Sequence, residues 1–335
     1  MMIPPKLKAG DGVRIIAPSC TLASLAWMTD AYLDRAKQFF LDRGMTVSEG
    51  EYVREKDDFD STSIEHRISD LHDAFLDPSV QLIATIRGGW NCNQLLRYLD
   101  YDLIRKHPKI LCGFSDITAL GNAIFAKTGL VTYSGPNLCH FSFGPQLQYS
   151  FDSYKRCLMQ EIPFDIHPSK EWTDDRFTSE HELLVFEPNE GYWTLQEGEA
   201  RGTLIGGNLC TLILLQGTEY MPSLKESILF LEDDYETHPR TFDRQLQSII
   251  HQPDFGGVKG IVFGRFQKYA ANKDMQPMDR ILLTQIVASK QELKKMPIIA
   301  NVDFGHTHPI ITFPIGGKVR MIATHEKSTI TIEEH

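Results

Sequence analysis

The chain has 335 residues, of which 42% are hydrophobic and 23% charged, and its net charge is −10 with histidine neutral. This length and composition predict a globular protein of one large or two ordinary domains, and they exclude disordered and fibrous classes. The acidic charge argues against partners such as nucleic acid or an anionic membrane, which attract basic surfaces. No stretch has the roughly 18–20 consecutive apolar residues that cross a bilayer.

Six cysteines are scattered along the chain without a CxxC pair, and the N-terminal residues lack the apolar core of a signal peptide. Such cysteine usage is typical of reduced thiols in a cytosolic protein. A chain of this length buries enough surface to fold without a disulfide or a metal. We therefore expect a cytoplasmic protein.

The first part of the chain alternates short apolar runs with segments of helical period. The predicted strands cover residues 13–17, 45–47, 80–86 and 110–114. The predicted helices cover residues 31–43, 63–76, 95–104 and 117–127. Strands and helices that alternate across short turns indicate βαβ units and a parallel sheet.

This alternation of apolar runs and helical segments disappears from about residue 143 to residue 199, a stretch too long for an ordinary loop. Beyond it, strands are predicted at 202–205, 227–231, 260–264, 297–300, 318–322 and 330–332, with helices at 208–215, 241–250 and 278–289. We therefore divide the chain into an N-terminal α/β domain (1–145), a connection or lid (146–199) and a smaller, mixed α/β C-terminal domain (200–335).

Ser115 follows a predicted strand at a strand-to-helix turn, and polar groups at strand ends form the sites of open α/β sheets. A serine in this position exposes its hydroxyl, and the backbone N–H of Asp116 opens the next helix. Together they offer a nucleophile and one oxyanion donor, although the G-x-S-x-G pattern is incomplete. Helix N-capping is the alternative, and for such a pair taken alone it is the commoner role.

An acid and two histidines follow later strands in the same way. Glu232 ends the strand 227–231 and can orient a histidine, whereas a solvated acidic turn is the alternative. His306 and His308 follow the strand 297–300, where a histidine acts as a general base or simply bonds the backbone. Serine, acid and histidine in this chain order are one known arrangement of a hydrolase triad.

Two glycine pairs also follow predicted strands, and the absence of a side chain lets their backbone N–H groups approach a ligand. The candidate binding residues in and beside these pairs are Gly88, Gly89, Trp90, Asn91, Gly207 and Asn208. Neither pair matches a dinucleotide fingerprint or a P-loop, so no nucleotide cofactor is predicted. An ordinary tight turn is the alternative for both.

These motifs resemble the LD-carboxypeptidases together with the microcin C immunity peptidases, a family of serine carboxypeptidases with a Ser-Glu-His triad. The matching pieces occur in the family's order over almost the whole chain. They are Ile16-Ala-Pro-Ser19, Arg87-Gly-Gly-Trp-Asn91, Gly113-Phe-Ser-Asp-Ile-Thr-Ala119, Gly202-Thr-Leu-Ile-Gly-Gly-Asn208, Leu229-Phe-Leu-Glu-Asp233, Phe304-Gly-His-Thr-His-Pro309 and Phe313-Pro-Ile-Gly316.

The resemblance implies Ser115 as nucleophile, Glu232 as orienting acid and His306 as base, with an oxyanion hole made by the backbone N–H groups of Gly89 and Asp116. It also implies a flavodoxin-like N-terminal domain, a smaller C-terminal α/β domain and a homodimer, with no cofactor. The second histidine of the Phe-Gly-His-Thr-His-Pro motif is not the family's catalytic position.

Within the family, the likeness is closer to the immunity-peptidase branch. The sequences Asn91-Cys-Asn93, Tyr101-Asp102 and His306-Thr-His-Pro309 resemble that branch, whereas the other branch usually has Tyr-Gly after the glycines. Cys92 stands where a serine is expected in this branch. The resemblance offers two substrates, a murein tetrapeptide that loses its terminal D-alanine or an aminoacyl nucleotide. In the second case Trp172 or Trp90 is the candidate to stack on adenine, and packing is the alternative.

Two rival functions remain open from the residues. One is a metal-dependent hydrolase with His306, His308, Asp303 and Glu232 as ligands, since an HxH pair can bind zinc. The other is a small-molecule binding protein without enzymatic activity, because two α/β lobes joined by a connection also describe that class.

Overall fold

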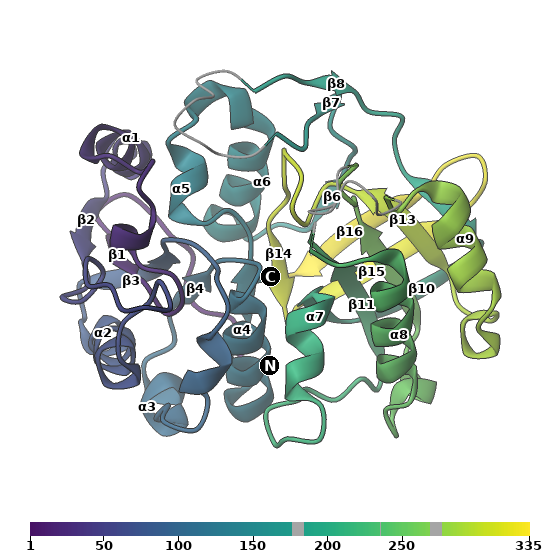
Figure 1. The fold of residues 1–335 in the computed structure, drawn as a ribbon, viewed down its shortest axis with the longest axis horizontal. Coiled ribbons are helices and arrows are strands. Elements are labelled where there is room, and N and C mark those ends of the chain that lie inside the picture. Colours follow the sequence, from purple (N-terminus) through teal and green to yellow (C-terminus); the bar gives the residue numbers. More distant parts are fainter. Residues whose placement is uncertain (176–183, 235, 269–276) are drawn as a thin grey trace.

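The computed structural model describes residues 1–175, 184–234, 236–268 and 277–335. Two β-sheets lie side by side, each with helices packed against it (Figure 1). The helices are α1 (Asp30–Leu41), α2 (Ile64–Leu76), α3 (Tyr101–Lys106), α4 (Ile117–Thr128), α5 (Leu138–Phe141), α6 (Gln148–Met159), α7 (Leu209–Leu212), α8 (Pro239–Ile250) and α9 (Arg280–Ala288). None of these described helices is long and apolar enough to cross a membrane.

The first sheet has the strand order β14-β5-β4-β3-β1-β2. Its strands are β1 (Gly12–Ile16), β2 (Thr46–Glu49), β3 (Val80–Thr85), β4 (Ile110–Cys112), β5 (Thr132–Ser134) and β14 (Phe313–Ile315). Strands β1 to β5 pair in parallel, whereas β14 pairs antiparallel with β5. The predicted parallel sheet of the N-terminal region is confirmed, and one strand from near the end of the chain completes its edge.

The second sheet has the strand order β6-β16-β15-β10-β11-β12-β13-β9. Its strands are β6 (Phe164–Ile166), β9 (Trp193–Gln196), β10 (Gly198–Asn208), β11 (Ser227–Glu232), β12 (Gly260–Gly264), β13 (Ile298–Val302), β15 (Lys318–Ala323) and β16 (Thr329–Glu334). The central strands β10 to β13 are parallel and the outer pairs antiparallel, so the predicted mixed sheet is also confirmed. A small separate ribbon joins β7 (Glu171–Trp172) to β8 (Glu187–Pro188).

The structure differs from the predicted elements in several places, and β5, α5 and β14 are elements that were not predicted. The predicted helix 95–104 is wrong over its first half, because the side chain of Asp100 accepts a hydrogen bond from the Leu103 N–H and starts α3 only at Tyr101. The described residues of the segment 146–199 contain elements that its sequence did not predict: α6, β6, β7, β8 and β9. Strands β6 and β9 form opposite edges of the second sheet.

Helix α4 lies between the two sheets and holds them together (Figure 1). Its first eight residues are all buried, and its apolar side chains share one core with side chains of β10 and α7. Polar contacts fix the approach: the Asn122 side chain donates to the Gly206 carbonyl over 2.9 Å, and the Asn208 N–H donates to the Thr118 hydroxyl over 3.0 Å. Gly207, which has a φ of +128°, lies so close to α4 that a Cβ there would be 2.4 Å from the Thr118 hydroxyl oxygen.

Replacing Gly207 with alanine is therefore expected to lower the free energy of unfolding by about 1–3 kcal/mol, because the backbone is in the left-handed region and the added methyl group overlaps α4. Urea unfolding of the purified variant measures this change. Gly256→Ala is the matched control, since a Cβ at Gly256 meets nothing within 4 Å. Equal unfolding midpoints for the two variants would contradict the role of Gly207.

Candidate active site

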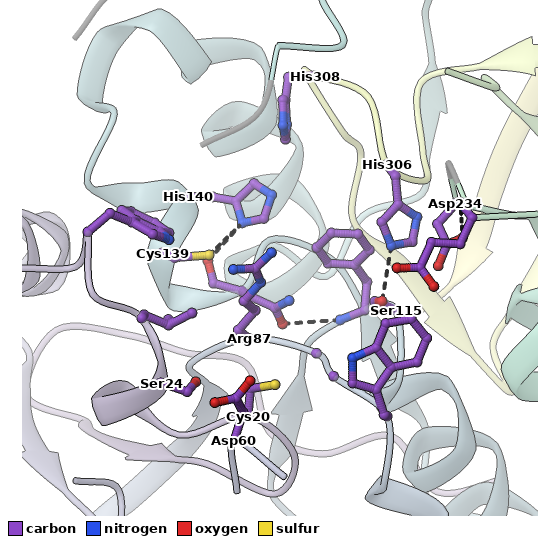
Figure 2. A pocket seen from close by; sticks show the side chains of 18 of the residues that line it. Cys20, Ser24, Asp60, Arg87, Ser115, Cys139, His140, Asp234, His306 and His308 are labelled. Carbon is purple, nitrogen blue, oxygen red and sulfur yellow. Dashed lines mark hydrogen bonds between the residues drawn. The ribbon is translucent and has the colours of Figure 1, made fainter. Parts of the chain in front are cut away.

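Ser115 lies on a strained turn between β4 and α4. Its φ is +66°, in the left-handed region that non-glycine residues rarely adopt. The Asn137 side-chain oxygen fixes the turn, because it accepts hydrogen bonds from the Phe114 N–H (3.2 Å) and from the Thr85 hydroxyl (2.7 Å). The predicted strand-to-helix turn therefore exists, and Ser115 lines a cavity at the carboxyl end of β4 (Figure 2).

Ser115, His306 and Glu232 form one chain of hydrogen bonds. The His306 Nε2 atom lies 3.0 Å from the Ser115 hydroxyl oxygen (Figure 2). Its Nδ1 atom lies 2.8 Å from a Glu232 carboxylate oxygen. Glu232 is buried at the end of β11, where Gly305 leaves room for it: a Cβ at Gly305 would be 2.9 Å from the carboxylate. The structure thus brings together three side chains that lie up to 191 positions apart in the sequence.

A buried ion pair holds the segment that carries His306. Asp303 accepts a 2.6 Å bond from the Arg265 guanidinium, and both side chains are almost fully buried. Asp303 also accepts bonds from the N–H and the hydroxyl of Ser169, each 2.8 Å long. Beyond His306, His308 exchanges two 2.7 Å backbone hydrogen bonds with Thr173. The turn that carries the His306 imidazole is therefore held by hydrogen bonds on both sides, at Asp303 and at His308.

The charge of the acidic strand end sets the protonation state of His306. Burial lowers its pKa, but the negative charges of Glu232, Asp234 and Asp233 outweigh burial and raise the pKa to about 9. Because this value lies above that of an unfolded histidine, the ion pair stabilises the fold fully below about pH 6.5. This contribution disappears as the pH rises through 9. Burial and the neighbouring Glu232 likewise raise the pKa of Asp233 to about 7.

The loop with the first glycine pair lies directly over the nucleophile. A Cβ at Gly88 would be 2.8 Å from the Ser115 Cβ and 3.1 Å from the Asp116 nitrogen. The N–H groups of Gly89 and Asp116 donate to no other atom among the described residues. Two free donors beside a serine hydroxyl have the composition of an oxyanion hole.

Two buried charges that the sequence analysis missed hold this loop. The Asp116 carboxylate accepts a 2.5 Å bond from the Ser19 hydroxyl and a 2.8 Å bond from the Cys92 N–H. Arg67 donates to the Asn91 side-chain oxygen (3.0 Å) and to the carbonyl oxygen of Pro18 (3.3 Å). The available signal was the position of Arg67 on the apolar face of α2, where a charged residue needs buried partners.

The cavity has a volume of about 460 Å³ and lies between the two sheets. Among the predicted residues, Ser115, His306, Gly88, Gly89, Trp90 and His308 line it, and Glu232 and Asp116 lie behind this lining.

Four other predicted binding residues do not line the cavity. Asn91 is bound to Arg67, Gly207 packs on α4, and Asn208 caps α7 by accepting from the Thr211 N–H. Trp172 lies in β7, where the cationic groups of Arg265 and Lys268 each lie 4.9 Å from its ring centroid.

The metal-ligand set of the alternative function is not assembled in the described part of the chain. Asp303 is paired with Arg265 and Glu232 with His306. Burial and the nearby charge of His306 lower the pKa of His308 to about 3, so its imidazole is neutral. Among the described residues, one cluster of side chains has the composition and spacing to hold a metal ion, and it contains neither histidine: Cys210, Asp233 and Asp234.

Comparisons with known proteins identify the family of this chain. Residues 13–135 match the model of the LD-carboxypeptidase N-terminal domain, and residues 201–321 match that of the LD-carboxypeptidase C-terminal domain. The chain belongs to the LD-carboxypeptidase family. The predicted family is thereby confirmed, and with it a carboxypeptidase hydrolase.

Individual relatives of this LD-carboxypeptidase family member extend over its full length. A putative carboxypeptidase, YocD, from Bacillus subtilis is 50% identical, and the match covers 100% of both chains. The crystal structure of an MccF-like protein from Bacillus anthracis superposes with a TM-score of 0.95 at 48% identity, again over 100% of both chains. The microcin C7 self-immunity protein MccF in complex with aspartyl sulfamoyl adenosine has a TM-score of 0.87 at 28% identity, covering 100% of this chain and 99% of that one.

The left-handed conformation of Ser115 has a measurable effect on stability. We expect Ser115→Gly to be more stable than Ser115→Ala by about 0.5–1 kcal/mol, because only glycine adopts this backbone without strain. Urea unfolding of the two variants measures the difference. The same pair of substitutions at Ser142, whose φ is −68°, is the control and should show the opposite order. The same order at both positions would contradict the strain at Ser115.

The acidic neighbours of His306 predict an unusual titration. In an NMR titration of the protein, the His306 imidazole should change its protonation near pH 9, and Glu232→Gln should move the midpoint to lower pH. Glu219→Gln removes a surface carboxylate that pairs with Lys127 and is the control; it should leave the midpoint in place. A midpoint that Glu232→Gln does not lower would refute the electrostatic assignment.

Proposed function

We propose that this family member is a serine carboxypeptidase with Ser115 as nucleophile, His306 as general base and Glu232 as orienting acid. The observation that carries the proposal is the continuous hydrogen-bonded path from the Ser115 hydroxyl through the imidazole to a buried carboxylate. Its two distances, 3.0 and 2.8 Å, are those expected of a nucleophile, its base and the group that orients the base.

The reaction follows from these positions. The reaction starts from the neutral His306 imidazole, the form that increases as the pH rises toward its pKa of about 9. The Nε2 atom of this neutral imidazole takes the proton of the Ser115 hydroxyl as the serine oxygen attacks the scissile carbonyl carbon. Glu232 holds the Nδ1–H tautomer and stabilises the imidazolium that forms. The imidazolium then gives its proton to the leaving amine, and water hydrolyses the acyl-enzyme by the same steps in reverse order.

The oxyanion of each tetrahedral intermediate would accept from the N–H groups of Gly89 and Asp116. A donor of this kind typically contributes ~3–4 kcal/mol to lowering the barrier. Asp116 also positions the loop through its carboxylate, so one residue connects the donor, the Ser19 segment and the Cys92 amide. None of these steps needs a metal.

Two substrate classes fit the cavity. Its volume of about 460 Å³ lies in the range of small-molecule sites, which suits either a murein tetrapeptide or an aminoacyl nucleotide. The related MccF structure with an aspartyl sulfamoyl adenosine supports the second class. An exposed aromatic ring at the cavity is available for a base: 65% of Trp90 is accessible to solvent.

The decisive experiment is mass spectrometry of two parallel digests in the presence of a chelator. One digest contains a murein tetrapeptide, and the other an aminoacyl adenylate analogue with a hydrolytically stable phosphate linkage. Loss of alanine from the tetrapeptide would assign the murein class, whereas cleavage of the amide of the adenylate alone would assign the nucleotide class.

Ser115→Ala should abolish turnover of either substrate, while circular dichroism shows an intact fold. Turnover by Ser115→Ala would refute the nucleophile, and dependence on a metal would favour the rival metallohydrolase.

A further inference from the structure

Arg87 projects into the cavity from the position directly before the glycine pair (Figure 2). Its side chain is exposed to the cavity solvent, although the residues on either side of it, Ile86 and Gly88, are buried. Among the described residues it makes no ion pair, hydrogen bond or cation–π contact. A guanidinium with five donors and no partner in the described part of the chain, in a cavity beside a nucleophile, is available to a ligand.

Three groups on which the charge of Arg87 acts, the Cys139 and Cys20 thiols and the His140 imidazole, carry no negative charge. Burial raises the pKa of the Cys139 thiol to about 11 and raises that of the Cys20 thiol, so both thiols stay protonated at neutral pH. Burial lowers the pKa of His140 well below its usual value, so this imidazole is neutral. The positive charge of Arg87 acts on all three groups, which places it among them. The wall around Arg87 is therefore neutral.

The other charged groups of the cavity lining are four carboxylates and His306, whose positive charge is paired with the Glu232 carboxylate. The four carboxylates are those of Asp60, Asp175, Asp234 and Glu236. Asp60 is already paired with Lys56 over 2.9 Å, and the N–H of Glu236 bonds Asp234 over 2.9 Å. An anionic ligand group is repelled by these carboxylates and attracted by Arg87, so the lining directs a negative charge to this guanidinium.

The distance between Arg87 and the oxyanion donor Gly89 suits a substrate whose charge lies one residue beyond the scissile carbonyl. Arg87 is two residues from Gly89, whose N–H is an oxyanion donor in the proposed function, and two residues span at most about 7 Å. In a peptide, the terminal carboxylate lies one residue beyond the scissile carbonyl, roughly 3.5 Å along an extended backbone. The side chain of Arg87 is therefore long enough to meet a charge on the leaving residue while the carbonyl oxygen occupies the oxyanion site.

We infer that Arg87 binds the anionic group on the leaving part of the substrate. This inference rests on the proposed function, since it uses the same serine and oxyanion site. The shared chemistry is a planar or tetrahedral oxyanion just beyond the scissile amide: the α-carboxylate of a terminal amino acid, or the phosphoryl group of a nucleotide. A guanidinium bonds either of them through two parallel N–H donors. By binding the terminal carboxylate of a peptide, Arg87 restricts cleavage to the last residue of that peptide.

The test uses binding, so that it does not depend on turnover. Isothermal titration calorimetry measures the affinity of the Ser115→Ala protein for a murein tetrapeptide and for its C-terminal amide. A second pair of ligands is an aminoacyl sulfamoyl adenosine and an analogue that keeps the aminoacyl and adenosine groups but joins them through an uncharged linker. In one of the two pairs the anionic ligand should bind about 10- to 100-fold more tightly than its neutral partner, the effect of one charge-assisted bond. The pair that shows this preference identifies the source of the anion.

Adding Arg87→Gln should remove that preference by weakening the anionic ligand alone, and Arg87→Lys should restore it in part. The control is Arg97→Gln, which removes an exposed arginine outside the cavity lining and should change neither affinity. Thermal unfolding of Arg87→Gln should match that of the parent, because Arg87 bonds none of the residues that the structure describes. A preference that survives Arg87→Gln, or equal binding of the anionic and neutral ligands in both pairs, overturns the inference.

Two results distinguish the binding role of Arg87 from the proposed reaction of Ser115. If the anion preference depends on Arg87 but wild-type protein turns over neither substrate, Arg87 is confirmed and the proposed reaction is wrong. If turnover requires Ser115 but the preference is independent of Arg87, the reaction is supported and the role of Arg87 is refuted.

Discussion

The hydrogen bond between Ser115 and His306 joins two sheets that come from different parts of the chain. A bond of 3.0 Å tolerates little relative movement, so the arrangement of the sheets has to be fixed on the same scale. Helix α4 fixes it through its buried face, through the Asn122 amide and through the close contact of Gly207 with Thr118. Because α4 begins two residues after Ser115, the element that carries the nucleophile is also the one that holds the second sheet in place.

Buried charge supports the site on each side of this contact. In the first sheet, the Asp116 carboxylate and the Arg67 guanidinium bond backbone and hydroxyl groups of two loops around the nucleophile. In the second, the ion pair of Asp303 with Arg265 fixes the turn before His306. Charged groups are costly to bury, and here each of them makes several directed bonds that hold the surrounding loops in one conformation.

The sequence predicted the fold where periodicity is local and failed where pairing is distant. The buried runs of β3, β11 and β12 and the amphipathic period of α2 identify these elements without tertiary information. Strands β6 and β9 are short and only half-buried, and they exist because a sheet edge formed elsewhere pairs with them.

The candidate site shows the same limit. A strand-end serine, acid and histidine can be listed from the sequence, but only the folded chain shows that Asn91 and Asn208 bond the protein itself. Their glycine-asparagine signal is the same whether the amide faces a ligand or caps a helix. The partners of Asp116 and Arg67 are also invisible to periodicity, because each lies in another loop.

Strand β14 has a consequence for how the protein is made. It pairs Phe313 with Ser134 of β5, so the edge of the first sheet is completed by residues translated about 180 positions later. At ~5–20 residues per second, a ribosome needs roughly 10–35 s to cover this distance. During this interval the emerging N-terminal part exposes the open edge of β5, which is able to pair with another chain. Through this edge the nascent chain is able to bind chaperones or to associate with other copies of itself until almost the whole chain has been synthesised.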